Sequence, residues 1–555
     1  MPDSNQILEI EQQIRSDIDQ EHWYRVDTLY GELNRLKERD SESIRSHALA
    51  VQNAGDTARA ATMLRKAIRL SPDDPDARLQ LGSVYLAQKR HEEAEQVFRE
   101  VLKIDPDNVL GVRHLVQCLQ HTPEYRTEAE KLLRHAIGQD PENAAIWIQL
   151  ASIFANDYER YDEAADAFKR GLELAPESPS AYHNYGQLKR AHGDLEGAKK
   201  LLHRAIELQH PENTNYAFSL ALCYLFMEDL DLAMKWFRKA AELDSDNTAA
   251  QVYISFALFL QGKIRDGWEQ YESRLKLSEF KGLSYGRPRW DGSELDGLPI
   301  LLLREQGMGD NIQFIRYAKQ VAENGGKVVA VAWESLETLF KSVEGVSVVT
   351  LGVPEPKNFH RYCSLMSLPY ILGSDDDTVP DGRPYMKAPE ELIGKWRKTI
   401  EKHPGFRVGL VWRGNPRHVN DRFRSSSMTE MSQLLGLPGI SFFSLMKERP
   451  DSEAELPDGL IELGQDFNDF TDTAAAMECL DLIITVDTSI CHLAGAIGRP
   501  VWTMLAKGPD FRWGLRGETT PWYDSMKLYR QKTLGVWDDV YERLNSDIQD
   551  LATNS

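Results

Sequence analysis

The chain has 555 residues, too many for one ordinary hydrophobic core, so we expect two to four domains. Its formal net charge of −21 argues against binding nucleic acid or an anionic membrane through the whole surface, because both would repel it. The cysteines are odd in number, scattered and without a CxxC pair, which favours reduced thiols over disulfides or a zinc site. No signal peptide or bilayer-spanning stretch is visible, so a cytoplasmic location is expected.

Small and large apolar residues recur at a fixed period through the first half of the chain. An alanine returns every 34 or 35 residues, a large apolar residue follows four positions later, and a proline ends most units. The small residue lets two helices approach closely, and the proline stops the second helix of the unit. Six clear units span residues 42–247, and their alanines are Ala60, Ala94, Ala129, Ala164, Ala198 and Ala233.

This period resembles the tetratricopeptide repeat, a helix–turn–helix unit of about 34 residues. The resemblance implies an all-α superhelix over residues 1–278 whose concave face binds a peptide or protein. The alternative is a spacer or a dimerisation arm, and nothing in this half identifies the partner.

Beyond Tyr271 the helical period ends and a segment rich in Gly, Pro and Ser follows. Short apolar runs then alternate with helical stretches, which predicts parallel sheets with helices on their faces. The pattern breaks once, near Pro389, so we predict two α/β lobes at 279–388 and 389–555, the second ending in a helix. Ligands of such sheets bind at the carboxyl ends of the strands, so the lobes should face each other across a cleft.

The first predicted strand of the first lobe runs into Gly307-Met308-Gly309-Asp310. This turn lacks the third glycine of a dinucleotide-binding fingerprint and the Gly-Lys-Ser/Thr of an NTPase phosphate loop. We interpret the glycines as giving access to a bulky ligand, and Asp310 as a group for proton chemistry. The alternative is ordinary turn chemistry with Asp310 capping a helix.

In the second lobe, a buried strand runs into Asp487-Thr488-Ser489 and then a short helix. The start of a helix presents free N–H groups and a positive dipole end, which suit an anion. The same residues can also cap the helix with nothing bound. His492, in the first turn, is either a buried hydrogen-bonded histidine or borders a diphosphate or ribose.

A third stretch, residues 411–425, gathers arginines in a chain that is otherwise acidic. Arginine forks suit phosphate oxygens, and we expect one or two of them to reach a ligand. Lys447, after a later strand, is a further candidate for neutralising a leaving phosphate. The arginines are Arg413, Arg417, Arg422 and Arg424.

Together, GMGD, VWRGNP, FFSLMK and VDTSICHLAGAIGRPVW resemble the ADP-heptose heptosyltransferase-type glycosyltransferases. More closely, the chain resembles bacterial proteins that join tetratricopeptide repeats to such a domain. The motif resemblance covers residues 287–529 and implies a two-lobed GT-B-like fold with a nucleotide-sugar donor held mainly by the second lobe. It also implies inverting transfer with no metal or other cofactor, to a protein acceptor such as flagellin. The plan is similar to that of O-GlcNAc transferase, whose own motifs are not evident.

Carried over by position, the family's general base falls on Asp310, and its donor-contacting acid–hydroxyl pair falls on Asp487 and Thr488. Its basic residue falls on Arg422 or Arg424, although a heptosyltransferase usually carries lysine there, which weakens the case for ADP-heptose as the donor. His360 is an alternative base or an acceptor contact, or simply a hydrogen-bonded loop histidine. The expected donor site comprises Gly307, Gly309, Asn415, Arg422, Arg424, Lys447, Asp487, Thr488, Ser489 and His492.

Two other interpretations stay open, and a third is discounted. The repeats could form a scaffold whose two-lobed domain is catalytically silent, although the presence of both Asp310 and the anion site argues against it. The acceptor could be a glycan or a lipid. A metal-dependent GT-A transferase using Asp375, Asp376 and Asp377 is discounted, because no strand precedes these residues.

Overall fold

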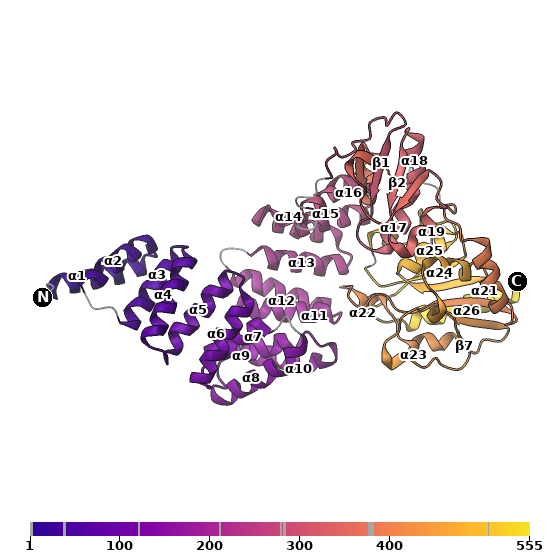
Figure 1. Ribbon diagram of the computed structural model, residues 1–555. Coiled ribbons are helices and arrows are strands. Elements are labelled where there is room, and N and C mark those ends of the chain that lie inside the picture. The colour runs from indigo at the N-terminus through magenta and orange to yellow at the C-terminus, as the bar shows by residue number, and fades with distance from the viewer. Residues whose placement is uncertain are drawn as a thin grey trace. The chain divides into compact units, whose positions relative to one another are not determined.

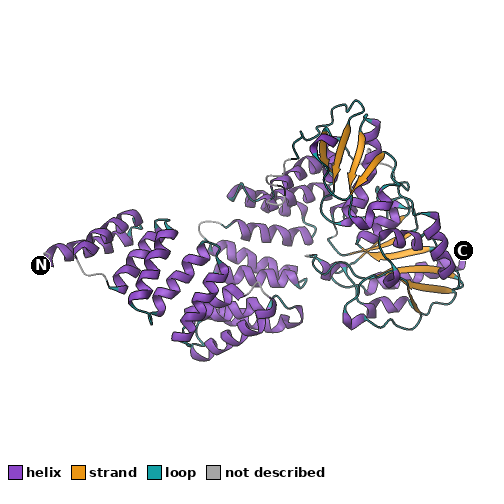
Figure 2. Cartoon of the chain, viewed as in Figure 1, coloured by secondary structure: helices purple, strands orange, loops and turns teal. Residues whose placement is uncertain are grey.

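The structure is a computed structural model that describes residues 4–36, 40–119, 123–209, 213–277, 280, 285–375, 382–418, 420–508 and 510–554. It divides into two compact units, Met1–Gln209 and His210–Ser555. The strands of the described part all belong to the second unit, where they form two separate groups (Figures 1 and 2). The predicted boundary between residues 278 and 279 lies outside the described residues, as do Asp376 and Asp377.

The first unit consists of helices that pack in successive antiparallel pairs, as predicted (Figure 1). The recurring alanines Ala60, Ala94 and Ala129 are fully buried, and so are the large residues four positions later, such as Phe98. A side chain at Gly82 would overlap the ring of Phe98, so the helix pair needs a glycine there. The helices are α1 (Ser4–Asp19), α2 (Trp23–Leu36), α3 (Ser41–Asn53), α4 (Thr57–Leu70), α5 (Pro75–Ala87), α6 (His91–Ile104), α7 (Val109–Leu119), α8 (Arg126–Gln139), α9 (Ala144–Phe154), α10 (Tyr161–Leu174), α11 (Pro179–Ala191) and α12 (Leu195–Leu208).

The second unit begins with two more helix pairs of the same kind. Ala233 and Phe237 on α14 are fully buried and continue the small–large period. The second of these pairs shares one hydrophobic cluster with the sheets that follow, through residues such as Phe259 and Trp268. The last repeat helices and both lobes are therefore parts of one compact body. The helices are α13 (Thr214–Phe226), α14 (Leu230–Leu243), α15 (Thr248–Leu260) and α16 (Ile264–Tyr271), followed by the 3-10 turn η3 (Glu272–Lys276).

The first lobe is a four-stranded parallel sheet with the order β3-β2-β1-β4. The chain therefore leaves β1 on one side for β2 and returns to its other side with β4, which makes the carboxyl ends of β1 and β4 a topological switch point. The strands are β1 (Pro299–Leu303), β2 (Lys327–Val331), β3 (Val346–Thr350) and β4 (Arg361–Ser364). The helices are α17 (Met308–Phe314), α18 (Ala318–Glu323), α19 (Glu337–Phe340) and α20 (Leu368–Ile371).

The second lobe is a six-stranded parallel sheet with the order β10-β9-β8-β5-β6-β7. This is the doubly wound order of dinucleotide-binding sheets, with its switch point between β5 and β8. The strands are β5 (Phe406–Val411), β6 (Ile440–Ser444), β7 (Leu460–Glu462), β8 (Leu482–Val486), β9 (Val501–Leu505) and β10 (Met526–Arg530). The helices are α21 (Glu390–Ile400), α22 (Asp421–Arg424), α23 (Met428–Met431), α24 (Phe470–Met477), α25 (Ser489–Ala496) and the terminal α26 (Asp538–Asn554).

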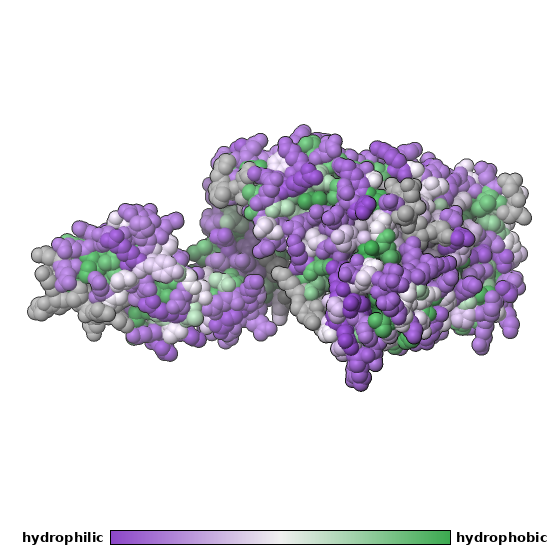
Figure 3. Space-filling model, turned by 90° about the horizontal axis from the view of Figure 1, so that it is seen from above, coloured by the Kyte–Doolittle hydropathy of each residue, from purple (hydrophilic) through white to green (hydrophobic). Residues whose placement is uncertain are grey.

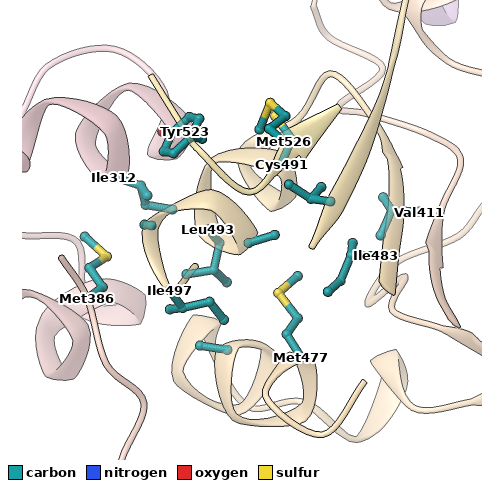
Figure 4. Packing of buried hydrophobic residues seen from close by; sticks show 14 of the residues in the cluster. Ile312, Met386, Val411, Met477, Ile483, Cys491, Leu493, Ile497, Tyr523 and Met526 are labelled. Carbon is teal, nitrogen blue, oxygen red and sulfur yellow. The ribbon is translucent and has the colours of Figure 1, made fainter. Parts of the chain in front are cut away.

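The two lobes meet where α17 packs against α25. Ile312 of α17 lies beside Leu493 and Ile497 of α25, and all three belong to the cluster that also fills the second lobe (Figure 4). Both helices begin directly after a strand, α17 after β1 and α25 after β8. Their contact therefore brings the carboxyl ends of the two sheets together, as the prediction of a cleft requires.

The visible surface is mostly hydrophilic with small scattered apolar areas (Figure 3). Across the described ranges, none of the helices combines the length and the apolar character that crossing a bilayer requires.

Candidate active site

A cavity of about 780 Å³ opens where the carboxyl ends of β1, β5 and β8 converge. Helices α13 and α15 of the repeat array close one side of it. Its lining includes nine of the twelve residues that the sequence assigns to the site. They are Gly307, Gly309, Asp310, Asn415, Arg424, Asp487, Thr488, Ser489 and His492.

The turn after β1 is held in one conformation by polar contacts. Gln306 has a φ of 55°, and its side-chain amide donates to the Tyr271 hydroxyl at 2.7 Å. Asn311 donates to the carbonyls of Glu305 and Gly307 at 2.8 and 2.7 Å. A left-handed non-glycine residue carries strain, which these contacts offset. The turn is therefore a rigid platform from which Asp310 projects.

Gly309 of the first lobe lies directly against the second lobe. A Cβ at this position would lie 2.9 Å from Cδ2 of His492 and 3.4 Å from the Cα of Ser489. Any side chain here would push α17 away from α25. This close packing gives the second glycine of the turn a physical role beyond the ligand access expected from the sequence.

Asp310 takes part in both capping and an interlobe ion pair. Its Oδ2 accepts the Gly307 N–H at 2.8 Å at the start of α17, and its Oδ1 pairs with the Arg512 guanidinium. Burial raises the pKa of the Asp310 carboxyl, and the charge of Arg512 opposes that rise. Each oxygen keeps a further lone pair, and the side chain is 18% exposed, so the carboxylate can still accept a proton.

Arg512 lies in the 3-10 turn η11 (Phe511–Trp513) of the second lobe. Its guanidinium also contacts Asp510 Oδ1 and Gln313 Oε1, each at 2.7 Å, and the side chain is only 8% exposed. Sequence reasoning missed Arg512, because it belongs to no motif and reaches Asp310 across 202 positions of chain. A single buried cation thus joins the two lobes at the candidate base.

The start of α25 supplies hydroxyl and carboxylate groups to the cavity. Thr488 is the N-cap, and its Oγ1 accepts the Ile490 N–H at 3.3 Å. Arg424 on α22 donates to the Asp487 carbonyl at 3.0 Å, and it therefore links the loops after β5 and β8 across the switch point. Burial, together with the nearby charge of Asp510, raises the pKa of Asp487 to about 6.

His492 fits the first of its two expected interpretations, a buried hydrogen-bonded histidine. Its Nδ1 lies 2.9 Å from the Tyr523 hydroxyl, and its ring stacks on Trp513 with centroids 5.3 Å apart. Burial, followed by the charges of Arg512 and Arg316, lowers the pKa of His492 well below its usual value. It is therefore a buried neutral histidine that also lines the cavity.

Asp487, Cys491 and His492 form a group whose potential ligand atoms all lie within 4.8 Å of one another. Thiolate is the form of cysteine that binds metals. The Cys491 sulfur instead contacts the Thr488 carbonyl at 2.9 Å, and burial raises the pKa of its thiol, which favours the protonated form. The donor chemistry is therefore poorly suited to a metal, and metal-independence stays a prediction.

Three predicted residues, His360, Arg422 and Lys447, do not line this cavity. His360 precedes β4, and its backbone N–H donates to the Pro299 carbonyl at 2.8 Å. Pro299 is the first residue of β1, so this hydrogen bond lies at the amino end of the sheet, whereas the cavity lies at the carboxyl end. The assignment of His360 as a base or an acceptor contact is therefore corrected.

The two basic residues are held elsewhere by local geometry. Arg422 is exposed and lies over the Phe423 ring, because it is two residues from Arg424 on one short helix and points to the other side. The Lys447 ammonium donates to the Asn468 carbonyl at 2.5 Å. Both donor-site assignments are corrected, since neither side chain reaches the cavity.

The repeat helices contribute an apolar wall that the sequence did not indicate. Tyr253, Phe256 and Leu260 follow one face of α15, and α13 adds two more apolar side chains. Phe256 stacks on Phe511, the neighbour of Arg512, with ring centroids 5.1 Å apart. The helical spacing of these residues is equally typical of a core, so no local signal distinguished them.

Comparison with family models matches the tetratricopeptide repeat at residues 46–109 and 126–179, at 155–223 and at 215–247. These matches show that the helix pairs within these ranges are tetratricopeptide repeats. A crystal structure of a tetratricopeptide repeat protein from Parabacteroides merdae is 12% identical, with a TM-score of 0.40, and the match covers 46% of this chain and 100% of that one.

Among curated proteins, Protein FlbA of Caulobacter vibrioides is 26% identical over 540 residues, which is 91% of this chain and 84% of the relative. Protein O-mannosyl-transferase TMTC3 of Homo sapiens is 20% identical over 244 residues, 44% of this chain and 24% of the relative. Protein O-mannosyl-transferase Tmtc1 of Drosophila melanogaster is 34% identical over 112 residues, 19% of this chain and 13% of the relative. The chain thus contains tetratricopeptide repeats and two parallel-sheet lobes, and it is similar along most of its length to FlbA.

Proposed function

We propose that the chain is a glycosyltransferase that moves a sugar from a nucleotide-sugar donor to a hydroxyl group, with its two lobes in a GT-B-like arrangement. One observation carries the proposal. A carboxylate of the first lobe, Asp310, and the anion-suited turn of the second lobe, Asp487 to Ser489, line the same cavity. A transferase needs both an acceptor base and a place for a leaving phosphate, and the cavity offers one from each lobe.

The donor fits the second lobe at the switch point between β5 and β8, where doubly wound sheets bind nucleotides. Arg424 and Arg417 line this side of the cavity and can neutralise a diphosphate, together with N–H groups at the start of α25. Asp487 is better suited to a sugar or ribose hydroxyl, because a carboxylate would repel phosphate. Such positive groups stabilise the leaving phosphate by several kcal/mol, on the order of 3 for one well-placed donor.

In the proposed reaction, the acceptor oxygen attacks the anomeric carbon while Asp310 removes the proton from that oxygen. The new bond joins the acceptor oxygen to the sugar, and the bond between the anomeric carbon and the phosphate oxygen breaks, so the nucleotide leaves with the electron pair. Burial raises the pKa of Asp310, which makes it a stronger base than an exposed aspartate. A base in this position accelerates such a step by roughly 10²–10⁴-fold.

We propose a protein as the acceptor, with a Ser or Thr presented to Asp310. The support is architectural: the matched repeats extend to residue 247, and α13 in the last of them, with the next helix pair's α15, builds a wall of the cavity itself. The O-mannosyl-transferase names of two partial relatives agree with transfer to a protein, although the matches span at most 24% of those relatives. Flagellin as the acceptor and metal-independent inverting transfer are parts of this proposal that rest on sequence resemblance.

A silent scaffold is the second candidate, and one observation favours it. Asp310 already accepts the Gly307 N–H and pairs with Arg512, so its carboxylate has a complete structural role without any substrate. In this interpretation the lobes serve only to hold the end of the repeat array.

Replacing Asp310 with Asn tests the two candidates. The amide keeps the size of the side chain but cannot take a proton, so we expect transfer to fall at least about 100-fold while nucleotide-sugar binding changes little. Binding is measured by calorimetry with a panel of nucleotide sugars, and transfer by release of the free nucleotide. Asp291→Asn, an exposed acid of the first lobe, is the matched control. Wild-type chain that binds no nucleotide sugar would favour the scaffold.

A further inference from the structure

A second cavity, of about 500 Å³, lies beside the candidate active site and shares Ala506 and Gly508 with it. Its walls come from the loops after β9 and β10, from α26, and from Glu228 at the turn between α13 and α14. We call it the basic pocket, because half of its ten lining residues are cations in a chain whose net charge is −21. The cations are Lys507, Arg516, Arg530, Lys532 and Arg543.

The charge of Arg530 is not neutralised at contact distance. Its guanidinium donates to main-chain carbonyls, including those of Gly517 and Gly514 at 2.9 Å and Trp513 at 2.6 Å. Among the described residues no carboxylate lies within ion-pair distance of it. Burial lowers the pKa of the Arg530 guanidinium to about 10, as expected for a cation without a close counter-ion. A positive charge is therefore held in the wall of the pocket by the fold itself.

Two of the other cations share one acid on α26. Arg543 pairs with Asp539 at 3.1 Å, and Lys532 is 4.0 Å from the same carboxylate. One carboxylate cannot neutralise two cations, so this side of the basic pocket keeps a net positive charge.

The last two cations lie at the side nearest the active site. Arg516 pairs with Glu228 at 3.2 Å while its side chain is 85% exposed. Lys507 has no ion pair within the part of the chain that the structure describes. Five cations thus face two carboxylates, which leaves a local excess of three positive charges.

We propose that the basic pocket binds acidic side chains of the protein acceptor, next to the hydroxyl that is presented to Asp310. The proposal rests on the function proposed above. The donor side of the cavity lies at β5 and β8, whereas the basic pocket lies at β9 and β10 and is closed by Glu228 from a repeat turn. A polypeptide that follows the α13 and α15 wall into the active site therefore passes it, and its carboxylates meet the excess positive charge.

The test uses the full chain and two fluorescent peptides that contain one serine. One peptide is rich in Asp and Glu, and the other carries Asn and Gln in their place. We expect the acidic peptide to bind at least about tenfold more tightly by fluorescence anisotropy, and this preference to shrink with added salt. The double variant Lys507→Gln with Lys532→Gln should weaken binding of the acidic peptide about tenfold. This variant leaves Arg530 and Arg543, which hold the loops, in place.

The matched control is Lys398→Gln with Lys402→Gln, which removes the same charge from exposed positions in and after α21. If both double variants weaken binding equally, the effect is one of net charge and the proposal is wrong. The proposal is also wrong if the Lys507/Lys532 variant binds inorganic pyrophosphate more weakly but binds the acidic peptide as tightly as the wild type. The pocket would then bind the phosphates of the donor.

Binding in the absence of donor separates this proposal from the proposed function. If the chain binds the acidic peptide through Lys507 and Lys532 but transfers no sugar, the basic pocket is supported and the proposed enzymatic function is wrong. If the chain transfers sugar to both peptides with the same kcat/KM, the proposed function is supported and the role of the basic pocket in acceptor binding is wrong.

Discussion

The pairing of individual charged residues determines what each acid of the candidate site can do. Asp310 and Asp487 both sit at the carboxyl end of a strand, and burial raises the pKa of each carboxyl. Asp310 has a direct cationic partner, Arg512, which comes from the opposite lobe, whereas Asp487 is bonded to Arg424 only through its backbone carbonyl. The two acids therefore differ in environment, and we assign them different tasks: proton transfer to Asp310 and hydroxyl binding to Asp487.

Arg512 should set the pH range in which the enzyme works. A general base acts only when it is deprotonated, so activity is lost as the pH falls through its pKa. Because Arg512 opposes the rise of the Asp310 pKa, Arg512→Met should move the acid limb of kcat/KM to higher pH. Arg512→Lys, which keeps the charge, should move it less.

Removing one partner of a buried pair also costs about 3–5 kcal/mol of stability, so the fold of each Arg512 variant is checked by thermal unfolding. A folded Arg512→Met variant whose pH profile matches the wild type would show that this cation does not tune Asp310.

Asp487 should lower the stability of the chain at neutral pH. Its pKa of about 6 in the folded chain lies above its ordinary value of 3.8. The folded state therefore binds this proton more tightly than the unfolded state does. Protonated Asp487 favours folding at low pH, and this stabilisation is lost as the pH rises through about 6. We expect Asp487→Asn to raise the Tm at a pH of about 7.5 more than at about 4.5, while weakening nucleotide-sugar binding. Equal shifts of the Tm at both values would contradict the prediction.

At the scale of elements, the contact between α17 and α25 aligns the two lobes. This contact depends on Gly309, which has His492 and Ser489 directly against it. The hydrophobic cluster behind it, with Ile312 against Leu493, holds the helices at this separation (Figure 4). A small change in the spacing of two helices is enough to move the base away from the donor.

Gly309→Ala should therefore reduce transfer much more than it reduces stability. The added methyl group would lie 2.9 Å from His492, so the lobes must separate by a few tenths of an ångström or more. A misplacement of about 1 Å can cost roughly 100-fold in rate. Gly394→Ala is the control, because the space around Gly394 on α21 is open. Full activity of Gly309→Ala, measured beside an unchanged Tm, would show that the lobes tolerate the displacement.

In the assembled chain, the last repeat helices belong to the same compact unit as the two lobes. Arg274 in η3 is buried, pairs with Glu305 soon after β1, and donates to Ser367 at 2.9 Å. Burial raises the pKa of Glu305, and Arg274 opposes that rise. The end of the repeat array thus neutralises a carboxylate five residues before the candidate base, and Tyr271 positions Gln306 beside it.

A fragment of residues 210–555 should therefore fold, whereas 279–555 should not. The shorter fragment loses Arg274 and leaves Glu305 buried without its partner, which alone costs about 3–5 kcal/mol. It also uncovers the side of the core that Phe259 and Trp268 fill. Resistance to limited proteolysis and a cooperative thermal transition measure the outcome. Equal protection of both fragments would mean that the lobes are independent of the repeats.

Much of this architecture could be predicted from the sequence, because its signals are local. The period of Ala94 and Phe98 records the packing of neighbouring helices, and strand–helix alternation records the parallel sheets. A glycine-containing or hydroxyl-containing turn after a strand, as at Gly307 and Thr488, marks the edge where ligands bind. Nine residues of the cavity could be named from such turns together with the arginine cluster and the motif resemblance.

Which charged side chains meet is settled only once the chain has folded. Arg512 reaches Asp310 from the other lobe, and Phe256 reaches the cavity from the repeats. His360 and Arg422 carry suitable chemistry, yet one precedes its strand and the other points away from the cavity. Periodicity and strand ends depend on neighbours a few residues apart, so the sequence determines them. The pairing of lobes depends on contacts between distant segments, which only the folded chain brings together.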